Sequence, residues 1–212
     1  MLDIDGVLIR DPLLLEHVRY NVIQYVRTKL PHAKQPDRVN RLLYNHYGHT
    51  ARGLKHAFRI DTRDFNEKVY TPRLTDHLWE VLSGTEFQQE AEIIHEISQK
   101  GWDVTLFSNA PLSWSMPVMH AIGHNVTVRH NHLYLKPETG AYAGFSSSQR
   151  HLFVDDSVMN LHAANSIQNW IPVYYTGDRD KTHGEFPTVG SIWELELMCG
   201  AIDKFGLNAI SV

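Results

Sequence analysis

Two carboxylates near the start of the chain constrain its fold more than any other sequence feature. The chain begins MLDIDGVL, so Asp3 and Asp5 flank one apolar residue and precede Gly6. In an extended strand, side chains two residues apart lie on the same side, and a glycine lets the backbone turn sharply beyond them. This pattern predicts a short strand that ends on a carboxylate pair suited to phosphoryl transfer. Acidic pairs before a glycine also occur in ordinary turns and in calcium loops.

Two further segments place polar residues at the end of apolar runs. In LFSNA, a strand expected at 102–107 ends on Ser108 and Asn109, where a hydroxyl can hold a phosphate oxygen. In LYLKPETG, Lys136 follows apolar residues and precedes Pro137, where the chain must leave a helix or a central strand. A lysine at this point can neutralise a phosphate and an attacking carboxylate together.

A fourth segment, HLFVDDS, predicts a metal site. The apolar run 151–154 is typical of a strand, and it ends on Asp155 and Asp156, with Ser157 positioned to cap the next helix. Mg²⁺ prefers oxygen ligands and keeps waters and substrate phosphate in its coordination shell, so one or two protein carboxylates suffice to hold it. Mg²⁺ is therefore the expected cofactor.

The segments DIDG, SNA, LKP and VDDS occur in this order between residues 3 and 156. Together they resemble the four-motif signature of the haloacid dehalogenase-like (HAD) hydrolase superfamily. The resemblance implies a phosphatase in which Asp3 is the nucleophile and forms an aspartyl-phosphate that water later hydrolyses. Asp5 is then the general acid and base, which first protonates the leaving oxygen and later activates water.

The same resemblance implies the other site residues. Mg²⁺ would be held by the Asp3 carboxylate, the Asp5 backbone carbonyl and the Asp156 carboxylate, with Asp155 behind these ligands or bound through water. The phosphate would be held by Ser108, Asn109 and Lys136.

Two alternatives remain open from the sequence. A 2-haloacid dehalogenase has less use for an acid and a metal at these positions, so Asp5 and the two carboxylates of HLFVDDS favour a phosphatase. A non-catalytic binding protein could also keep this fold, but intact Asp3, Asp5, Lys136 and Asp156 argue against it.

Helix and strand patterns divide the chain into two parts. Residues 1–11 and 85–212 alternate strands with helices, which predicts an α/β core with a doubly wound, Rossmann-like parallel sheet. Residues 12–84 show helical periodicity without a convincing strand, beginning with Asp11 as the cap and Pro12 in the first turn. This part is expected to be a small helical cap inserted between the first and second motifs.

Local signals refine the predicted core. Capping boxes are expected at Thr85 with Gln88 and at Ser191 with Glu194, each before a helix. The interval between Lys136 and Asp155 is rich in glycine and serine, so any helix there must be short or irregular. The first strand is also expected to be unusually short, because two apolar residues precede Asp3; a late gene start or compensation elsewhere in the sheet are the alternatives.

The stretch 44–70, YNHYGHTARGLKHAFRID and onward, resembles the cap of the pyrimidine 5'-nucleotidase branch of the superfamily. This implies a nucleoside 5'-monophosphate substrate with pyrimidine preference, whose leaving group faces Tyr47, His49, Thr50 and Arg52. In the alternative interpretation Tyr47 is helix core, Gly48 is a helix cap, and Arg52 is solvated or salt-bridged. The following YTPRLTDHL departs from that branch, so a sugar phosphate or phosphoglycolate remains an alternative substrate.

Composition fits a small-molecule enzyme. The chain has 212 residues, of which 42% are hydrophobic, and a formal net charge of −4, which gives no basic footprint for a nucleic acid polymer. No apolar run is long enough to cross a membrane and no signal peptide is evident, so a cytoplasmic monomer or homodimer acting on a small phosphate ester is expected. The single cysteine, Cys199, lies on an apolar helical run and is expected to be buried.

Overall fold

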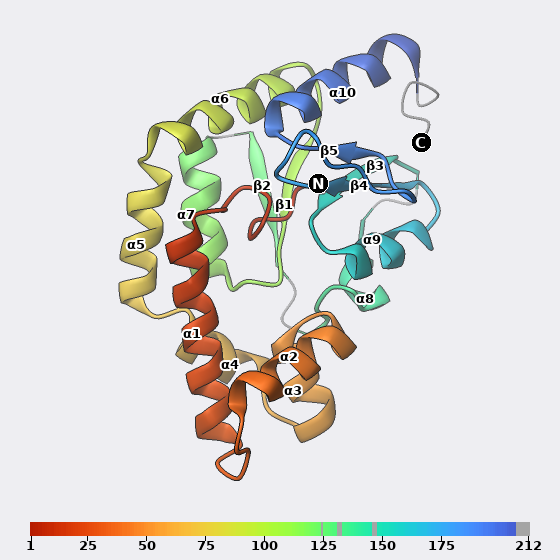
Figure 1. Ribbon diagram of the computed structural model, residues 1–212. Helices are drawn as coiled ribbons and strands as arrows, with labels where there is room; N and C mark the ends of the chain where they lie inside the picture. The colour runs from red at the N-terminus through yellow and green to blue at the C-terminus, as the bar shows by residue number, and fades with distance from the viewer. Residues whose placement is uncertain (124, 131–132, 146–147, 207–212) are drawn as a thin grey trace.

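Short parallel strands alternate with helices through the second half of the chain (Figure 1). The computed structural model describes residues 1–123, 125–130, 133–145 and 148–206. The strands are β1 (Val104–Phe107), β2 (Val126–Arg129), β3 (His151–Asp155), β4 (Trp170–Tyr175) and β5 (Thr188–Val189). The helices of this half are α6 (Thr85–Gln99), α7 (Leu112–Ile122), α8 (Thr139–Tyr142), α9 (Val158–Asn165) and α10 (Ile192–Phe205). The predicted α/β class is confirmed.

Residues 1–3 lie between two groups of parallel strands. β1 pairs with β2, and β3, β4 and β5 pair in that order. Leu2 forms isolated parallel bridges to Leu106 and Val154, the Asp3 amide donates to the Val154 carbonyl at 2.9 Å, and the Phe107 amide donates to the Leu2 carbonyl at 2.8 Å. The predicted first strand is therefore as short as the sequence suggested, and its pairing on both sides fixes Asp3 at the centre of the strand array.

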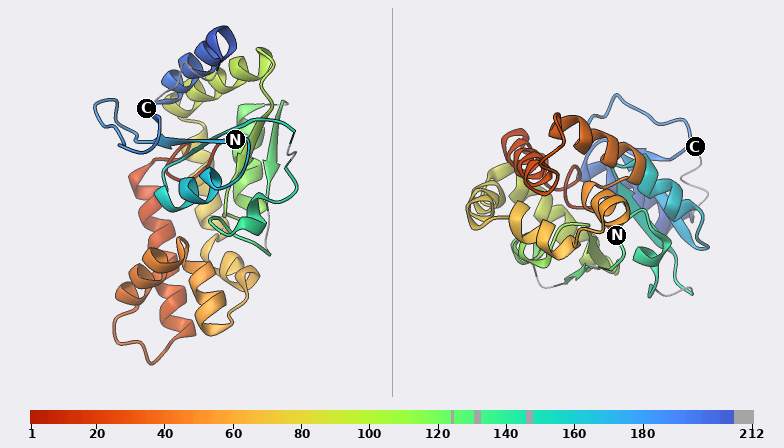
Figure 2. Two further views of the ribbon diagram at one scale, coloured as in Figure 1. Left: turned by 90° about the vertical axis from the view of Figure 1, so that its right-hand side faces the viewer. Right: turned by 90° about the horizontal axis from the view of Figure 1, so that it is seen from below.

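Helices cover the β3–β4–β5 group on opposite sides (Figures 1 and 2). α10 runs beside α6 on one side, while α9 packs against β3 and β4 from the other. α7 packs against β2 and α6. The strands β3 and β4 read HLFVD and WIPVYY, nearly continuous apolar runs of the kind found where a parallel sheet is covered on both faces.

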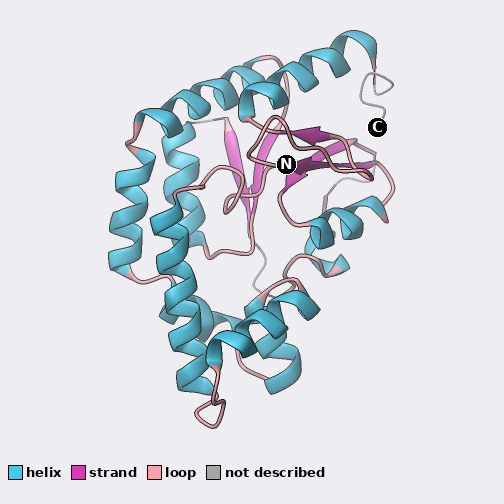
Figure 3. Ribbon diagram, viewed as in Figure 1, coloured by secondary structure: helices cyan, strands magenta, loops and turns pink. Residues whose placement is uncertain are grey.

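Residues 12–82 form five helices joined by short loops, with no strand among them (Figure 3). The helices are α1 (Pro12–Lys29), α2 (Pro36–Tyr47), α3 (Thr50–Phe58), α4 (Thr62–Val69) and α5 (Pro72–Leu82). Asp11 caps α1 by accepting from the Leu14 amide at 2.7 Å, and α2 ends at Gly48, whose φ of 76° is the left-handed conformation that glycine adopts without strain. The predicted helical character of this segment is confirmed. No described helix combines the length and the apolar character needed to cross a membrane.

The buried apolar side chains of residues 12–82 belong to two separate hydrophobic clusters. The C-terminal half of α1, with α2, α3 and α4, encloses its own cluster, which we call the cap cluster; its buried members are Val22, Tyr25, Val26, Leu43, Ala51, Leu54, Phe65, Val69 and Leu135. The first turn of α1 and the whole of α5 pack instead into the main cluster beneath the strands, through Leu14, Leu74, Leu78 and Leu82. Both ends of the predicted cap therefore share the core of the α/β part.

Of the two predicted capping boxes, the one before α6 is wrong and the one before α10 is confirmed in part. The box at Thr85 is wrong: Gly84 is the N-cap of α6, and the Gln88 side chain donates to the Leu82 carbonyl at 2.6 Å. At α10, Ser191 accepts from the Glu194 amide at 3.2 Å as expected, but the Glu194 carboxylate accepts from Gly190. Among the described residues between Lys136 and Asp155, the only helix is the short α8, as the glycines and serines predicted.

Candidate active site

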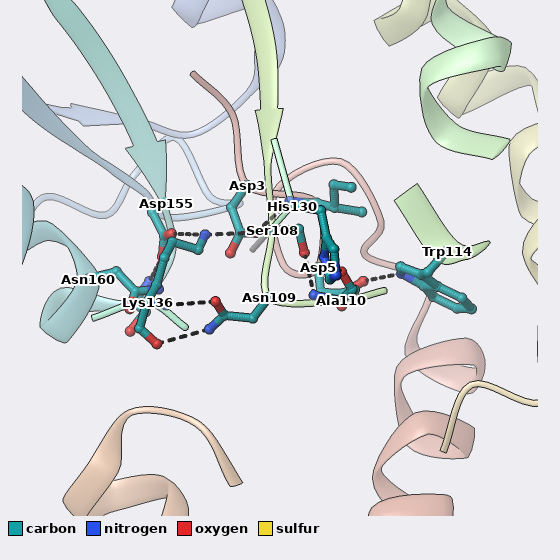
Figure 4. A network of polar contacts seen from close by, with 12 residues as sticks. Asp3, Asp5, Ser108, Asn109, Ala110, Trp114, His130, Lys136, Asp155 and Asn160 are labelled. Atoms are coloured by element: carbon teal, nitrogen blue, oxygen red, sulfur yellow. Dashed lines mark hydrogen bonds and ion pairs between the residues drawn. The ribbon is translucent and has the colours of Figure 1, made fainter. Parts of the chain in front are cut away.

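The carboxyl ends of the central strands meet at one edge of the sheet, where polar side chains gather (Figure 4). Asp3 follows the bridge at Leu2, Ser108 follows β1, and Asp155 ends β3. Open α/β sheets bind their ligands in the crevice beyond such strand ends. The structure thus brings the first, second and fourth sequence motifs together, and Lys136 from the third joins them.

Lys136 lies at the centre of this group. Its Nζ is 3.0 Å from Oδ1 of Asp3 and 2.7 Å from Oδ2 of Asp155, and the residue is 1% exposed. The ammonium also faces the rings of Phe107 and Phe153, at 5.1 and 5.3 Å from their centroids. Burial lowers the pKa of Lys136, but the two carboxylates outweigh this effect and bring it above its usual range. Lys136 is therefore a fixed cation.

Asp155 is fully buried and its oxygens are occupied. Besides Lys136, they accept from the Ser157 amide at 2.8 Å and from the Asn160 side chain at 3.0 and 3.1 Å. Ser157 is the N-cap of α9, although its own side chain makes no cap bond. These contacts suit Asp155 to orient Lys136 rather than to bind a ligand directly.

Asp156 is exposed to the cavity, unlike its neighbour. The pKa of Asp156 is raised to about 7 mainly by desolvation of its carboxyl group and, to a smaller extent, by repulsion from Asp155. Gly6 makes room for this side chain: a Cβ added to Gly6 would lie 2.1 Å from Oδ2 of Asp156, and its φ of 88° is left-handed. The glycine of DIDG is thus required both for the turn and for the Asp156 carboxylate.

The carboxylates of Asp3, Asp155 and Asp156 form a cluster whose candidate ligand oxygens all lie within 4.8 Å of one another. An all-oxygen donor set suits Mg²⁺ better than a softer metal. Within the described ranges, Oδ1 of Asn160 is buried without a hydrogen-bond donor, and Asn160 lines the same cavity. A water molecule on a hydrated cation could donate to this oxygen, so the residues fit the group that the sequence implied.

Asp5 is held by a contact that the sequence did not suggest. Trp114 of α7, fully buried, donates its indole N–H to Oδ1 of Asp5 at 2.9 Å, and the Tyr70 ring packs edge-on against Trp114. Burial raises the pKa of Asp5 to about 6, against the opposing influence of the indole donor and Lys136. Burial also raises the pKa of Asp3, and the Lys136 ammonium opposes that rise.

Ser108 and Asn109 have different surroundings. Ser108 lines the cavity, and its Oγ accepts from the Ala110 amide at 3.1 Å. The Asn109 side chain is engaged elsewhere: it donates to the Lys136 carbonyl at 2.9 Å and accepts from the Lys136 amide at 2.7 Å. The Asn109 side chain therefore holds the backbone of Lys136, while Asn109 also lines the cavity, and the expectation that its surroundings help to bind phosphate stays a prediction.

A cavity of about 440 Å³ opens from these residues toward the helical segment. His49 and Thr50, two of the four expected cap residues, line it. Thr50 donates to the side chain of Asn40 at 2.6 Å. Burial lowers the pKa of His49 to about 4, so its imidazole is neutral at physiological pH.

Tyr47 and Arg52 do not line this cavity. Arg52 turns away to the Glu138 carboxylate, with 3.0 Å between Nε and Oε1, and Tyr47 stacks on the ring of His56 at 5.9 Å between centroids. The expectation that these two residues face the leaving group is therefore wrong. Arg52 instead pairs with Glu138, which lies outside the cap.

Other cap residues take their place in the cavity wall. The wall includes Arg19 of α1 and a stripe of α2; the stripe is Asn40, Arg41, Tyr44 and Asn45, followed by Gly48. These positions repeat at intervals of four along α2, a spacing that puts residues on one helix face. This spacing is the sequence signal that could have found them.

No protein-family model matches the chain, and no curated protein matches it either.

Proposed function

We propose that this protein is a Mg²⁺-dependent phosphomonoesterase of the HAD type, with Asp3 as nucleophile. The observation that carries the proposal is the buried Lys136 ammonium, 3.0 Å from Asp3 and 2.7 Å from Asp155, beside a carboxylate cluster that opens into a cavity. A fixed positive charge beside a nucleophilic carboxylate favours attack on an anionic phosphate, because it offsets their mutual repulsion. In this proposal the strands form a doubly wound core and residues 12–84 act as the cap.

In the first step, an Asp3 oxygen attacks the phosphorus atom and the bond from phosphorus to the ester oxygen breaks. The electron pair leaves with that oxygen, which takes a proton from Asp5. Trp114 can only donate, so its bond to Oδ1 of Asp5 leaves Oδ2 to carry the acidic proton. The raised pKa of Asp5, about 6, keeps part of the population protonated near neutral pH.

In the second step, the Asp5 carboxylate takes a proton from water, and the water oxygen attacks the phosphorus of the aspartyl-phosphate. The bond between phosphorus and the Asp3 oxygen breaks, which releases inorganic phosphate and restores both side chains. Ser108 and the fixed Lys136 hold the phosphate oxygens through both steps.

Mg²⁺, held by the Asp3 carboxylate, the Asp5 carbonyl and the Asp156 carboxylate, would supply charge that screens the nucleophile from the phosphate. Asp155 contributes by orienting Lys136, since its oxygens are already engaged by Ser157 and Asn160.

For the substrate we propose a nucleoside 5'-monophosphate, with a pyrimidine base favoured. The cavity of about 440 Å³ falls within the usual range for small-molecule sites, and its wall carries the aromatic side chains of Tyr44, Phe65 and Tyr70 on the cap side. Aromatic rings and side-chain amides such as Asn40 and Asn45 suit a planar, polar base.

The test is phosphate release from a panel of nucleoside monophosphates, sugar phosphates and phosphoglycolate, with and without Mg²⁺. We expect metal-dependent release that Asp3→Asn abolishes, while Asp180→Asn, an exposed loop residue with the same charge change, leaves it intact. Absence of release from every compound, in protein shown to be folded, would overturn the proposal.

A further inference from the structure

The segment 133–138, which carries Lys136, is not part of a helix or strand. We call it the lysine segment. Its conformation therefore depends on side-chain and packing contacts rather than on a hydrogen-bonded ladder. Those contacts fall on two sides, and the cap side is the more extensive.

Leu135 belongs to the cap cluster. It is 3% exposed, and all other buried members of that cluster lie between residues 22 and 69. The residue immediately before the buried lysine is thus anchored in the helical segment, far from it in sequence.

Pro137, on the other side of Lys136, packs against the end of α2. A Cβ added to Gly48 would lie 2.8 Å from Cδ of Pro137, so only a glycine allows this approach. The two neighbours of Lys136 therefore both contact the cap.

Glu138 completes the contact with α3. Its Oε1 lies 3.0 Å from Nε of Arg52 and 2.8 Å from Nε2 of His56, and the Arg52 and Glu138 side chains are only 21% and 14% exposed. Upstream, Lys55 donates to the Leu133 carbonyl, and its ammonium faces the Tyr134 ring at 5.9 Å. A charge-assisted contact at this burial constrains position more than an exposed ion pair does.

Lys136 itself points the opposite way, into the core. Asn109 holds its amide and carbonyl, and its ammonium lies between Asp3 and Asp155. The lysine segment is thus clamped between the core, through Asn109, and the cap, through Leu135, Pro137 and Glu138.

We infer that the cap positions Lys136: Arg52 and Glu138 are positioning residues that hold the lysine segment against α3, so that the ammonium stays between Asp3 and Asp155. Cap docking and assembly of the reacting groups are therefore a single event. The catalytic consequence rests on the proposed phosphatase function, whereas the placement of Lys136 does not.

The test compares three variants: Arg52→Ala, Glu138→Ala, and a charge-swapped double variant that carries both Arg52→Glu and Glu138→Arg. Arg63→Ala is the matched control, because Arg63 pairs with Asp61 on the exposed surface of the cap. The first readout is hydrogen exchange of the Lys136 amide, which needs no activity. The second is kcat, KM and inhibition by vanadate, an analogue of the phosphoryl-transfer transition state.

We expect faster exchange at Lys136 in both single variants, with partial recovery in the charge swap and no change in Arg63→Ala. For the active enzyme we expect kcat to fall roughly 10- to 100-fold with KM little changed, because a small misplacement of a catalytic group costs rate rather than binding. Vanadate inhibition should weaken in parallel.

Unchanged exchange at Lys136 in both single variants would overturn the inference, as would wild-type kcat and vanadate inhibition in an active protein. An inactive wild-type protein would instead contradict the proposed function, and the exchange measurement would still decide whether the cap holds Lys136.

Discussion

The two ends of the cavity are built in different ways. At the sheet end, Lys136 lies 3.0 Å from Asp3 and 2.7 Å from Asp155, and all three residues are buried. At the cap end, Arg19 and Arg41 share Asp37, but their side chains are 59% and 58% exposed. Buried, hydrogen-bonded charges hold one geometry, whereas exposed ion pairs contribute little and rearrange readily.

This difference separates two tasks. The sheet end is preorganised, as a site that stabilises developing charge must be. Under the proposed function, the exposed Arg19 and Arg41 side chains at the cap end can adapt to the part of the substrate that does not react. The predictions below test the sheet end first and the cap end last.

The largest effect is expected from Asp5→Asn. Without an acid the first step slows by roughly 10²–10⁴-fold for an alkyl phosphate. p-Nitrophenolate leaves without a proton, so with p-nitrophenyl phosphate this variant should release one equivalent per protein and then stall as aspartyl-phosphate. Rapid-quench kinetics measures the burst, and Asp3→Asn should show none. Steady turnover by Asp5→Asn would contradict its assigned role.

Lys136→Met should be the most destabilising of these substitutions. Removing one partner of a buried charge group leaves the others uncompensated, at a cost of about 3–5 kcal/mol. Lys100→Met removes an ion pair with Glu196 in which the lysine is 52% exposed, so it should cost far less. Urea denaturation measures both. Equal losses would remove the distinction between buried and exposed charges.

Mg²⁺ should stabilise the protein more at pH 8 than at pH 5. In the folded protein the pKa values of Asp5 and Asp156 are about 6 and 7, well above the ordinary value of an aspartate side chain. Between the ordinary aspartate pKa and these raised values, the folded state binds more protons than the unfolded state does. The free energy of unfolding of the metal-free protein therefore falls as pH rises through that range. Mg²⁺ competes with those protons and favours the ionised carboxylates.

Thermal melting with and without Mg²⁺ at the two pH values measures this effect. At 100 times its dissociation constant, the ion should contribute about 2.7 kcal/mol. Asp156→Asn should abolish the shift, and a shift that is equal at both pH values would argue against binding at these carboxylates.

The smallest effect is expected at the cap end. Arg41→Ala removes an exposed ion pair and should change stability by under about 1 kcal/mol. Its influence should appear in the relative KM values of different phosphate esters, with kcat for each kept within a few-fold. A large loss of kcat would show that the cap end also takes part in the chemistry.

Local sequence signals anticipated the elements better than the contacts between them. The cap at Asp11, the short strand at Leu2 and the acidic end of β3 all follow from residue order over a few positions. The bond from Trp114 to Asp5 joins residues that no local pattern relates.

Side-chain directions depend on partners that are distant in sequence. Arg52 was expected in the cavity because its neighbours resemble a binding segment, yet Glu138 pairs with it from outside the cap. Asn109 follows a strand end, and its side-chain amide binds the backbone of Lys136, a contact that no pattern near Asn109 indicates. In both cases a partner distant in sequence determined the side-chain direction.

Gly6, in the first motif, packs closely against the side chain of Asp156 in the last motif. The space that a methyl group would need at residue 6 is filled by the carboxylate of Asp156. Gly6 therefore meets two demands, the left-handed φ of 88° and the space for the Asp156 carboxylate, and loss of the acid would remove only the second. An alanine at position 6 would strain the turn and displace the carboxylate, so it should weaken the Mg²⁺ binding proposed for this cluster even though Asp3 itself is kept.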